Sequence, residues 1–186
     1  MTAATRNRLF VVANVLLFQL CWVAFVGGAG KGRWWLGFPL LAGFAAWQLA
    51  ISRWPRADVL LIVVSAVLGF AMDSALVQAG LLEYSAPVPW EGFAPLWMVG
   101  LWIGFALTLN HSMTFLHGRP ALAALLGVIA GPFAYWIAAS QWNAATLHEP
   151  MWQPLAALAV AWGILTPVLA ELAAKLQSRE LRLQEA

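Results

Sequence analysis

The stretch VLLIVVSAVLGFAMDSALVQAG, residues 59–80, decides the fold of this chain. It consists almost entirely of apolar and small residues, and it reaches the roughly 20 residues that a helix needs to cross a hydrocarbon core about 30 Å thick. A single carboxylic acid, Asp73, interrupts it. The stretch therefore predicts a transmembrane helix that carries an ionisable group close to its middle.

The composition of the whole chain agrees with this interpretation. Of the 186 residues, 62% are hydrophobic and 10% are charged, whereas soluble domains are about 45–50% apolar and about 25% charged. An integral membrane protein is therefore expected, with the lipid bilayer as its surroundings. The single cysteine, Cys21, excludes an intramolecular disulfide and a multi-cysteine metal site. No basic stretch is dense enough to predict a nucleic-acid partner.

Six apolar segments are separated by connections rich in glycine and proline, such as GGAGKGR and EYSAPVPWEG. The fold class predicted is all-α, a polytopic membrane bundle of six transmembrane helices. These helices are expected at residues 9–28, 34–52, 59–82, 93–116, 120–140 and 152–174. They form one transmembrane domain over residues 1–175, and residues 176–186 are expected to be a charged, solvated cytoplasmic tail.

The basic residues predict the orientation of this bundle. With six helices, one side holds only Lys31 and Arg33. The other side holds eight basic residues, namely Arg6, Arg8, Arg53, Arg56, Arg119, Lys175, Arg179 and Arg182. Because Lys and Arg concentrate in cytoplasmic loops, both termini are predicted to lie in the cytoplasm.

Asp73 is expected to face the interior of the bundle. A charged side chain at this depth costs on the order of 2.5–3.5 kcal/mol on insertion scales. Ser65, Gly69 and Asp73 recur every four residues, and stripes of small residues mark faces where helices pack closely. The next two segments carry the same spacing, at Gly100, Gly104, Thr108 and Ser112 and at Gly127, Gly131 and Tyr135.

Position along the helices sorts the polar side chains into two layers. Asp73, Ser74 and Tyr135 fall in the predicted outer half, with Gln19 near the midplane. The inner half holds Asn14, Gln48, Thr108, Asn110, His111 and Thr166. At about 1.5 Å per residue, Asp73 and His111 are separated vertically by roughly 14 Å, which excludes a hydrogen bond between them. Tyr135 or Gln19 is the expected partner of Asp73.

Both ionisable groups allow a functional and a structural interpretation. Asp73 is either a titrating functional group, as intramembrane acids often are, or a carboxyl that fixes helix packing. His111 is either a proton relay or headgroup contact, or a neutral imidazole bonded between helices. The connection EYSAPVPWEGFAPLW, residues 83–97, is expected to be an ordinary loop anchored by Trp90 and Trp97, rather than a segment folded over the bundle mouth.

The sequence predicts neither a metal site nor a cofactor. The three histidines fall at different depths and form no HxxxH or ExxH pair. Nucleotide-binding and hydrolase motifs such as GxGxxG, GxSxG and HExxH are also missing. No catalytic residue is predicted.

Four segments carry a resemblance to a known family. They are LLFQLCW at 16–22, MDSAL at 72–76, APLWMVGLWIGFALTLNHS at 94–112 and GPFAY at 131–135. With these the whole chain resembles a small bacterial inner-membrane family catalogued only as a domain of unknown function. The resemblance implies a polytopic inner-membrane protein and a setting near enzymes that modify membrane fatty acids. It transfers no catalytic residue.

Three functions are compatible with these features. The bundle could bind a lipid or isoprenoid-like molecule, or assist an enzyme that modifies membrane lipids. It could instead be a small proton-coupled transporter that uses Asp73. It could also be a scaffold or assembly subunit whose small-residue stripes bind a membrane-protein partner.

Overall fold

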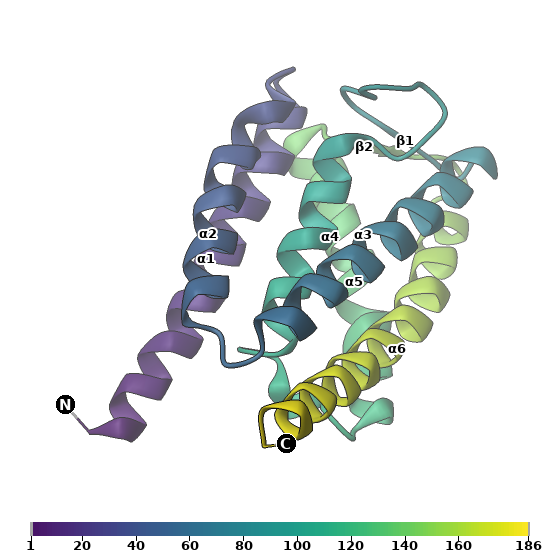
Figure 1. Cartoon of the computed structure of the whole chain (residues 1–186). Helices are drawn as coiled ribbons and strands as arrows, with labels where there is room; N and C mark the ends of the chain where they lie inside the picture. Colours follow the sequence, from purple (N-terminus) through teal and green to yellow (C-terminus); the bar gives the residue numbers. More distant parts are fainter. Residues whose placement is uncertain (1, 186) are drawn as a thin grey trace.

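The computed structural model describes residues 2–185 and is a bundle of helices (Figure 1). Within these residues, six α-helices follow one another along the chain, and two short strands pair beside them. The helices are α1 (Ala3–Ala29), α2 (Gly37–Ile51), α3 (Pro55–Gln78), α4 (Leu96–Leu109), α5 (Pro120–Trp142) and α6 (Trp152–Glu185). The 3-10 turns η1 (Trp34–Leu36) and η2 (Thr114–Leu116) precede α2 and α5. Figure 1 shows both termini at the same end of the bundle.

Five of the described helical segments are long and apolar enough to cross a membrane. They are Thr5–Ala29, Trp34–Ile51, Pro55–Gln78, Pro120–Trp142 and Trp152–Glu185. Their outward faces carry large apolar side chains, among them Val67, Ile129 and Val160, which are 62%, 61% and 63% exposed. An apolar exterior of this extent is unfavourable in water and suits hydrocarbon. The protein is therefore an integral membrane protein.

The fourth helix is shorter than predicted. It was expected over residues 93–116, but α4 ends at Leu109, and at about 1.5 Å per residue it is only about 21 Å long. The backbone turns after Leu109 because the amide of Met113 bonds back to the carbonyl of Thr108. The Asn110 and His111 side chains, on this turn, bind Asp58 of α3. Polar contacts to a neighbouring helix thus replace the last turns of the predicted span.

The C-terminal segment, expected as a charged tail, continues α6 as a helix, and most of its residues after position 177 are exposed. Glu180 is only 8% exposed, and its carboxylate accepts the backbone N–H of Ala57 at 2.7 Å and of Arg56 at 3.3 Å. These N–H groups belong to the first turn of α3, where they have no partner within the helix. Helix α3 accordingly begins at Pro55, four residues before its predicted start.

The connection after α3 is not an ordinary loop. Its strand β1 (Leu82–Tyr84) pairs antiparallel with β2 (Ala145–Leu147), which follows α5. Leu82 and Tyr84 point inward, whereas Glu83 between them is exposed. The indole nitrogen of Trp97 donates to the Ser85 carbonyl at 3.0 Å, and Trp97 is fully buried instead of anchoring the loop at an interface. The segment therefore folds back over the end of the bundle that lies opposite the two termini (Figure 1).

Two indole rings stack at the centre of the bundle. Their contacts explain why glycine is needed at two of the small-residue positions. The rings of Trp102 in α4 and Trp162 in α6 lie 4.5 Å apart with an interplanar angle of 15°. A Cβ at Gly69 would lie 2.1 Å from the Trp102 ring, and a Cβ at Gly131 would lie 2.4 Å from the Trp162 ring. Only glycine leaves room for this pair, so α3 and α5 enclose it from the two sides.

Glycine also sets the approach of α5 to α6. A Cβ at Gly127 would lie 2.2 Å from the backbone oxygen of Trp162. Gly100 leaves space for the ring of Phe25, and the Ser65 hydroxyl donates to the Trp102 carbonyl at 3.0 Å. A Cβ at Gly104 would lie 3.3 Å from Phe18. The small-residue positions thus pack against other helices of the same chain.

Candidate functional site

Asp73 is fully buried, and its carboxylate is bound by three side chains from three other elements. Its Oδ1 accepts the hydroxyl of Tyr84 from β1 at 2.6 Å and the hydroxyl of Tyr135 from α5 at 2.5 Å. Its Oδ2 accepts the indole N–H of Trp102 from α4 at 2.7 Å. Such donors are what a carboxylate needs when it is removed from water. Asp73 therefore links α3 to three other elements.

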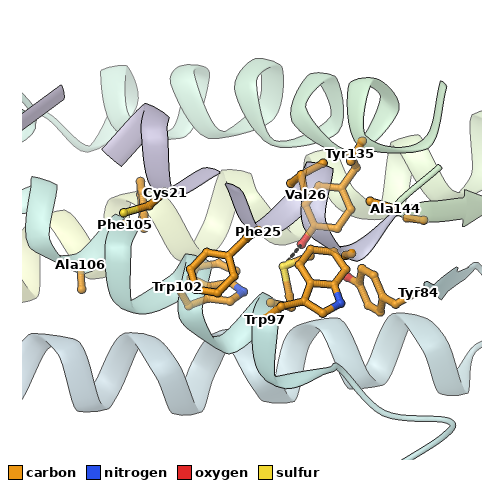
Figure 2. Close-up of a cluster of buried hydrophobic side chains, with 14 of the residues drawn as sticks. Cys21, Phe25, Val26, Tyr84, Trp97, Trp102, Phe105, Ala106, Tyr135 and Ala144 are labelled. Carbon is orange, nitrogen blue, oxygen red and sulfur yellow. Dashed lines mark hydrogen bonds between the residues drawn. The ribbon is translucent and has the colours of Figure 1, made fainter. Parts of the chain in front are cut away.

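Figure 2 shows Tyr84, Trp97, Trp102 and Tyr135 in one buried hydrophobic cluster. The rings of Tyr84 and Trp97 meet edge to face, 5.5 Å apart. The Tyr135 hydroxyl also lies 3.8 Å from the sulfur of Met98. The residue after the carboxylate, Ser74, accepts the backbone N–H of Ala94 at 3.1 Å. Together these contacts fix the 79–95 connection onto α3.

Of the two partners expected for Asp73, Tyr135 is one and Gln19 is not. Gln19 is exposed on α1 and lies along the cavity described below. The expected separation of Asp73 from His111 agrees with their contacts, because each binds a different set of side chains. Tyr84 and Trp102 are partners that sequence reasoning missed.

A second buried carboxylate, Asp58, binds the polar side chains of the inner layer. Its Oδ1 accepts the Asn110 amide at 2.9 Å. Its Oδ2 lies 3.0 Å from Nε2 of His111 and 2.5 Å from the Ser52 hydroxyl. The structure thus brings Asn110 and His111 together, as a contact between helices, around an acid that the sequence analysis placed in a loop. Its position three residues after Pro55, in a first helical turn, is the only signal that could have singled it out.

The remaining inner polar residues form a separate network. The Asn14 amide donates to Gln48 at 2.7 Å and to the backbone oxygen of Leu107 at 2.9 Å, and its Oδ1 accepts the Ser112 hydroxyl at 2.5 Å. This network joins α1, α2 and α4. The hydroxyl of Thr108 donates to the carbonyl of Phe105 in its own helix at 2.6 Å, so Thr108 belongs to neither network.

A cavity of about 520 Å³ lies beside the Asp73 cluster, between α1, α4, α5 and α6. Its volume is within the usual range for small-molecule sites, about 300–1,000 Å³. Tyr84, Trp102 and Tyr135 form part of its wall, while Asp73 itself lies behind them. The site therefore consists of an apolar chamber whose wall is held in place by a buried carboxylate.

The lining residues show where this cavity opens and what it can hold. Val15 on α1, Phe133 on α5 and Phe115 on η2 are 42%, 57% and 51% exposed. The cavity therefore reaches the apolar outer surface between these elements. Most of the wall is aliphatic or aromatic, and none of its residues is charged. The polar lining side chains outside the Asp73 cluster are Gln19, Thr108, Ser112 and Thr166, together with the indoles of Trp22 and Trp162.

Among the described residues, no three His, Cys, Asp or Glu side chains come close enough to hold a metal ion. The Asp58–His111 pair is accompanied by Ser52 and Asn110 and not by a third metal-binding group. This chemistry favours a structural hydrogen bond between Asp58 and His111 at the N-terminal end of α3.

A protein-family model described as Protein of unknown function (DUF2878) matches residues 11–168 of the chain. The chain belongs to this family. The matched range includes the Asp73 cluster, the Asp58 pair and every residue that lines the cavity. Neither the curated proteins nor the solved structures contain a match to this chain.

Proposed function

We propose that this protein binds a lipid or isoprenoid-like molecule in the cavity beside Asp73, and that it acts by holding that molecule or by presenting it to an enzyme that modifies membrane lipids. The observation that carries the proposal is the cavity itself: about 520 Å³, walled by apolar side chains and open on the apolar surface. A molecule dissolved in the hydrocarbon phase can reach such a site without crossing water.

The proposal places six helices across the bacterial inner membrane with both termini in the cytoplasm. The unequal distribution of basic residues supports this orientation. The outer surface between α1 and α5 then faces acyl chains, and the mouth of the cavity lies within the bilayer.

Two alternatives receive less support. A proton-coupled carrier needs a titrating group that water or substrate can reach, but Asp73 is fully buried and both of its oxygens bind other side chains. A scaffold that binds a partner through its small-residue stripes needs those stripes to be free. The space beside Gly69, Gly127 and Gly131 is already filled by Trp102 and Trp162.

The test is a variant that fills the cavity. Ala134 lies on the face of α5 that lines the cavity, so Ala134→Phe places a ring in the space that a lipid would occupy. Ile129→Phe is the matched control, because Ile129 is 61% exposed on the same helix and does not line the cavity. Each protein is purified from native membranes, washed in mild detergent and analysed by mass spectrometry for retained lipid.

We expect the natural protein and Ile129→Phe to retain one lipid species in near-stoichiometric amount, and Ala134→Phe to lose at least about nine-tenths of it. Circular dichroism verifies that all three proteins are folded. Equal lipid content in the three folded proteins, or no defined species in any of them, would contradict the proposed function.

A further inference from the structure

We infer that the molecule in the cavity is an uncharged lipid with a hydrogen-bond-accepting group, such as an ester carbonyl or a hydroxyl oxygen, that docks on Thr166 and Trp162 of α6. The inference rests on the proposed function and names the chemical class of its ligand.

The first observation is an unpaired hydroxyl. Thr166 is only 2% exposed and lines the cavity, yet its Oγ1 has no hydrogen-bond partner among the described residues. Threonine in a helix commonly bonds to a carbonyl of the preceding turn, as Thr108 does with Phe105. Thr166 makes no such bond, so its hydroxyl remains available.

The second observation is an unpaired indole on the same face. Trp162 lies four residues before Thr166, which places the two side chains about one helical turn apart. Its Nε1 is buried and lacks a well-formed hydrogen bond within residues 2–185, with the Tyr135 hydroxyl as a neighbouring polar group. Trp162 lines the same cavity, and its ring is held by the stack on Trp102. Buried donors that lack a well-formed hydrogen bond in an apolar site are unfavourable unless a ligand supplies an acceptor.

The opposing helix limits where that acceptor can lie. Gly127 and Gly131 of α5 face Thr166 and Trp162, since a Cβ at Gly127 would lie 2.6 Å from Oγ1 of Thr166. Both glycines line the cavity. Helix α5 therefore contacts this part of α6 closely, and a ligand oxygen can reach the two donors only from the cavity that Thr166 and Trp162 line.

The absence of charge in the wall determines the ligand class. No Lys, Arg, His, Asp or Glu side chain lines the cavity. A buried carboxylate or phosphate would have no counterion there, and burying an unpaired charge is strongly unfavourable. Because Trp N–H can only donate, the ligand must supply an acceptor. An uncharged ester or alcohol lipid meets both conditions, whereas an anionic headgroup does not.

The experiment compares four probes that have the same chain length: hexadecane, methyl palmitate, hexadecan-1-ol and palmitate. Delipidated full-length protein is titrated with each radiolabelled probe at pH 8, at fixed detergent concentration. We expect methyl palmitate and hexadecan-1-ol to bind at least about fivefold more tightly than hexadecane, the effect of one neutral hydrogen bond. Palmitate, which is ionised, should bind more weakly than either. The inference would be overturned if hexadecane bound as tightly as methyl palmitate and hexadecan-1-ol, or if palmitate bound most tightly of the four probes.

Variants of the hydroxyl test the docking group. Thr166→Val keeps the shape of the side chain but removes the donor, so binding of methyl palmitate should weaken about fivefold. Thr166→Ser should restore it. Thr146→Val is the control, because Thr146 is exposed on β2 and does not line the cavity, and it should change affinity less than twofold.

Thermal unfolding of the ligand-free variants distinguishes docking from a structural role. If the Thr166 hydroxyl is unpaired, Thr166→Val should unfold at the same temperature as the natural protein or higher, since it removes a buried polar group without a partner. A lower unfolding temperature, or unchanged methyl palmitate affinity, would refute the assignment of Thr166. If Ala134→Phe abolishes probe binding but Thr166→Val leaves the affinity unchanged, the proposed function stands and this inference alone is overturned.

Discussion

At the scale of single residues, Asp73 is best understood as a positioning residue. It does not line the cavity, but its three hydrogen-bond partners do. A carboxylate with three donors holds the side chains of Tyr84, Trp102 and Tyr135 in one arrangement. The cost of burying the acid is offset by these charge-assisted bonds, each worth about 1.5–3 kcal/mol. The shape of the chamber wall therefore depends on this group.

Replacing the acid by its amide tests this role. Asp73→Asn puts an N–H₂ group where donors already converge, so at least one donor loses its acceptor. We expect the free energy of unfolding to fall by about 2 kcal/mol or more, seen as a lower unfolding temperature in detergent by circular dichroism. Glu91→Gln, on the exposed loop, is the control and should leave the temperature unchanged. An Asp73→Asn protein as stable as the natural one would mean that the three bonds contribute nothing.

At the scale of the elements, the last part of α6 completes the start of α3. Glu180 accepts two N–H groups of the first turn of α3, and Gln184 donates to the carbonyl of Arg53 at 3.1 Å. A negative charge at a helix N-terminus also interacts favourably with the helix dipole. The same end of α3 carries Asp58, which binds the turn after α4. The inner ends of α3, α4 and α6 are thus held together by two acids.

Removing the Glu180 carboxylate should weaken this junction. For Glu180→Ala we expect a loss of about 1–2 kcal/mol in the free energy of unfolding, comparable to the loss of a helix cap. Glu185→Ala makes the same change at the exposed end of the same helix and should have no measurable effect. Thermal unfolding measures both, and cleavage by trypsin after Arg53 or Arg56 should accelerate only in Glu180→Ala. Equal behaviour of the two variants would contradict the capping role.

At the scale of the whole molecule, the structure is an apolar bundle with both termini at one end (Figure 1). The polar networks lie inside it, and the exposed faces of its long helices are largely aliphatic and aromatic. Such a surface turns the cavity mouth between α1 and α5 toward lipid. Under the proposed function, the orientation of the bundle in the membrane decides which leaflet delivers the lipid.

Labelling of single cysteines tests that orientation. The natural Cys21 is 1% exposed and is replaced by alanine to give a cysteine-free background. Lys31→Cys and Glu91→Cys should react with a membrane-impermeant maleimide in intact spheroplasts, because the charge distribution places these residues outside. Arg119→Cys and Arg182→Cys should react only after permeabilisation. The opposite pattern, or labelling of positions 119 and 182 from different sides, would overturn the predicted topology.

Some features of this protein follow from local sequence. Hydrophobic length and composition predict long apolar helices, because each span must satisfy its own backbone hydrogen bonds in hydrocarbon. The four-residue spacing of Ser65, Gly69 and Asp73 places them on one helix face, and the cost of an exposed acid in lipid turns that face inward. The inward position of Asp73 was predicted on these grounds, and the depth of the polar residues left Tyr135 or Gln19 as its expected partner.

Other features depend on how distant segments pack. Asp73 and Tyr135 are 62 residues apart, and Asp58 and Asn110 are 52 residues apart. Tyr84 lies in a proline-rich connection whose composition is typical of a loop, and Trp102 lies in an apolar run where an indole is unremarkable. Neither position signals that its polar atom reaches a buried carboxylate.

The sequence by itself determined an apolar helical bundle with polar groups turned inward, because burial and helix periodicity act along a continuous stretch of chain. Only the tertiary structure decided which donor meets which acid, and where helices leave a chamber between them. Hydrogen bonds act over about 3 Å, and a cavity is a gap between side chains that belong to several helices. The hydrogen-bond partners and the cavity therefore depend on how the helices are arranged in space. The residue pattern of a single helix does not specify that arrangement.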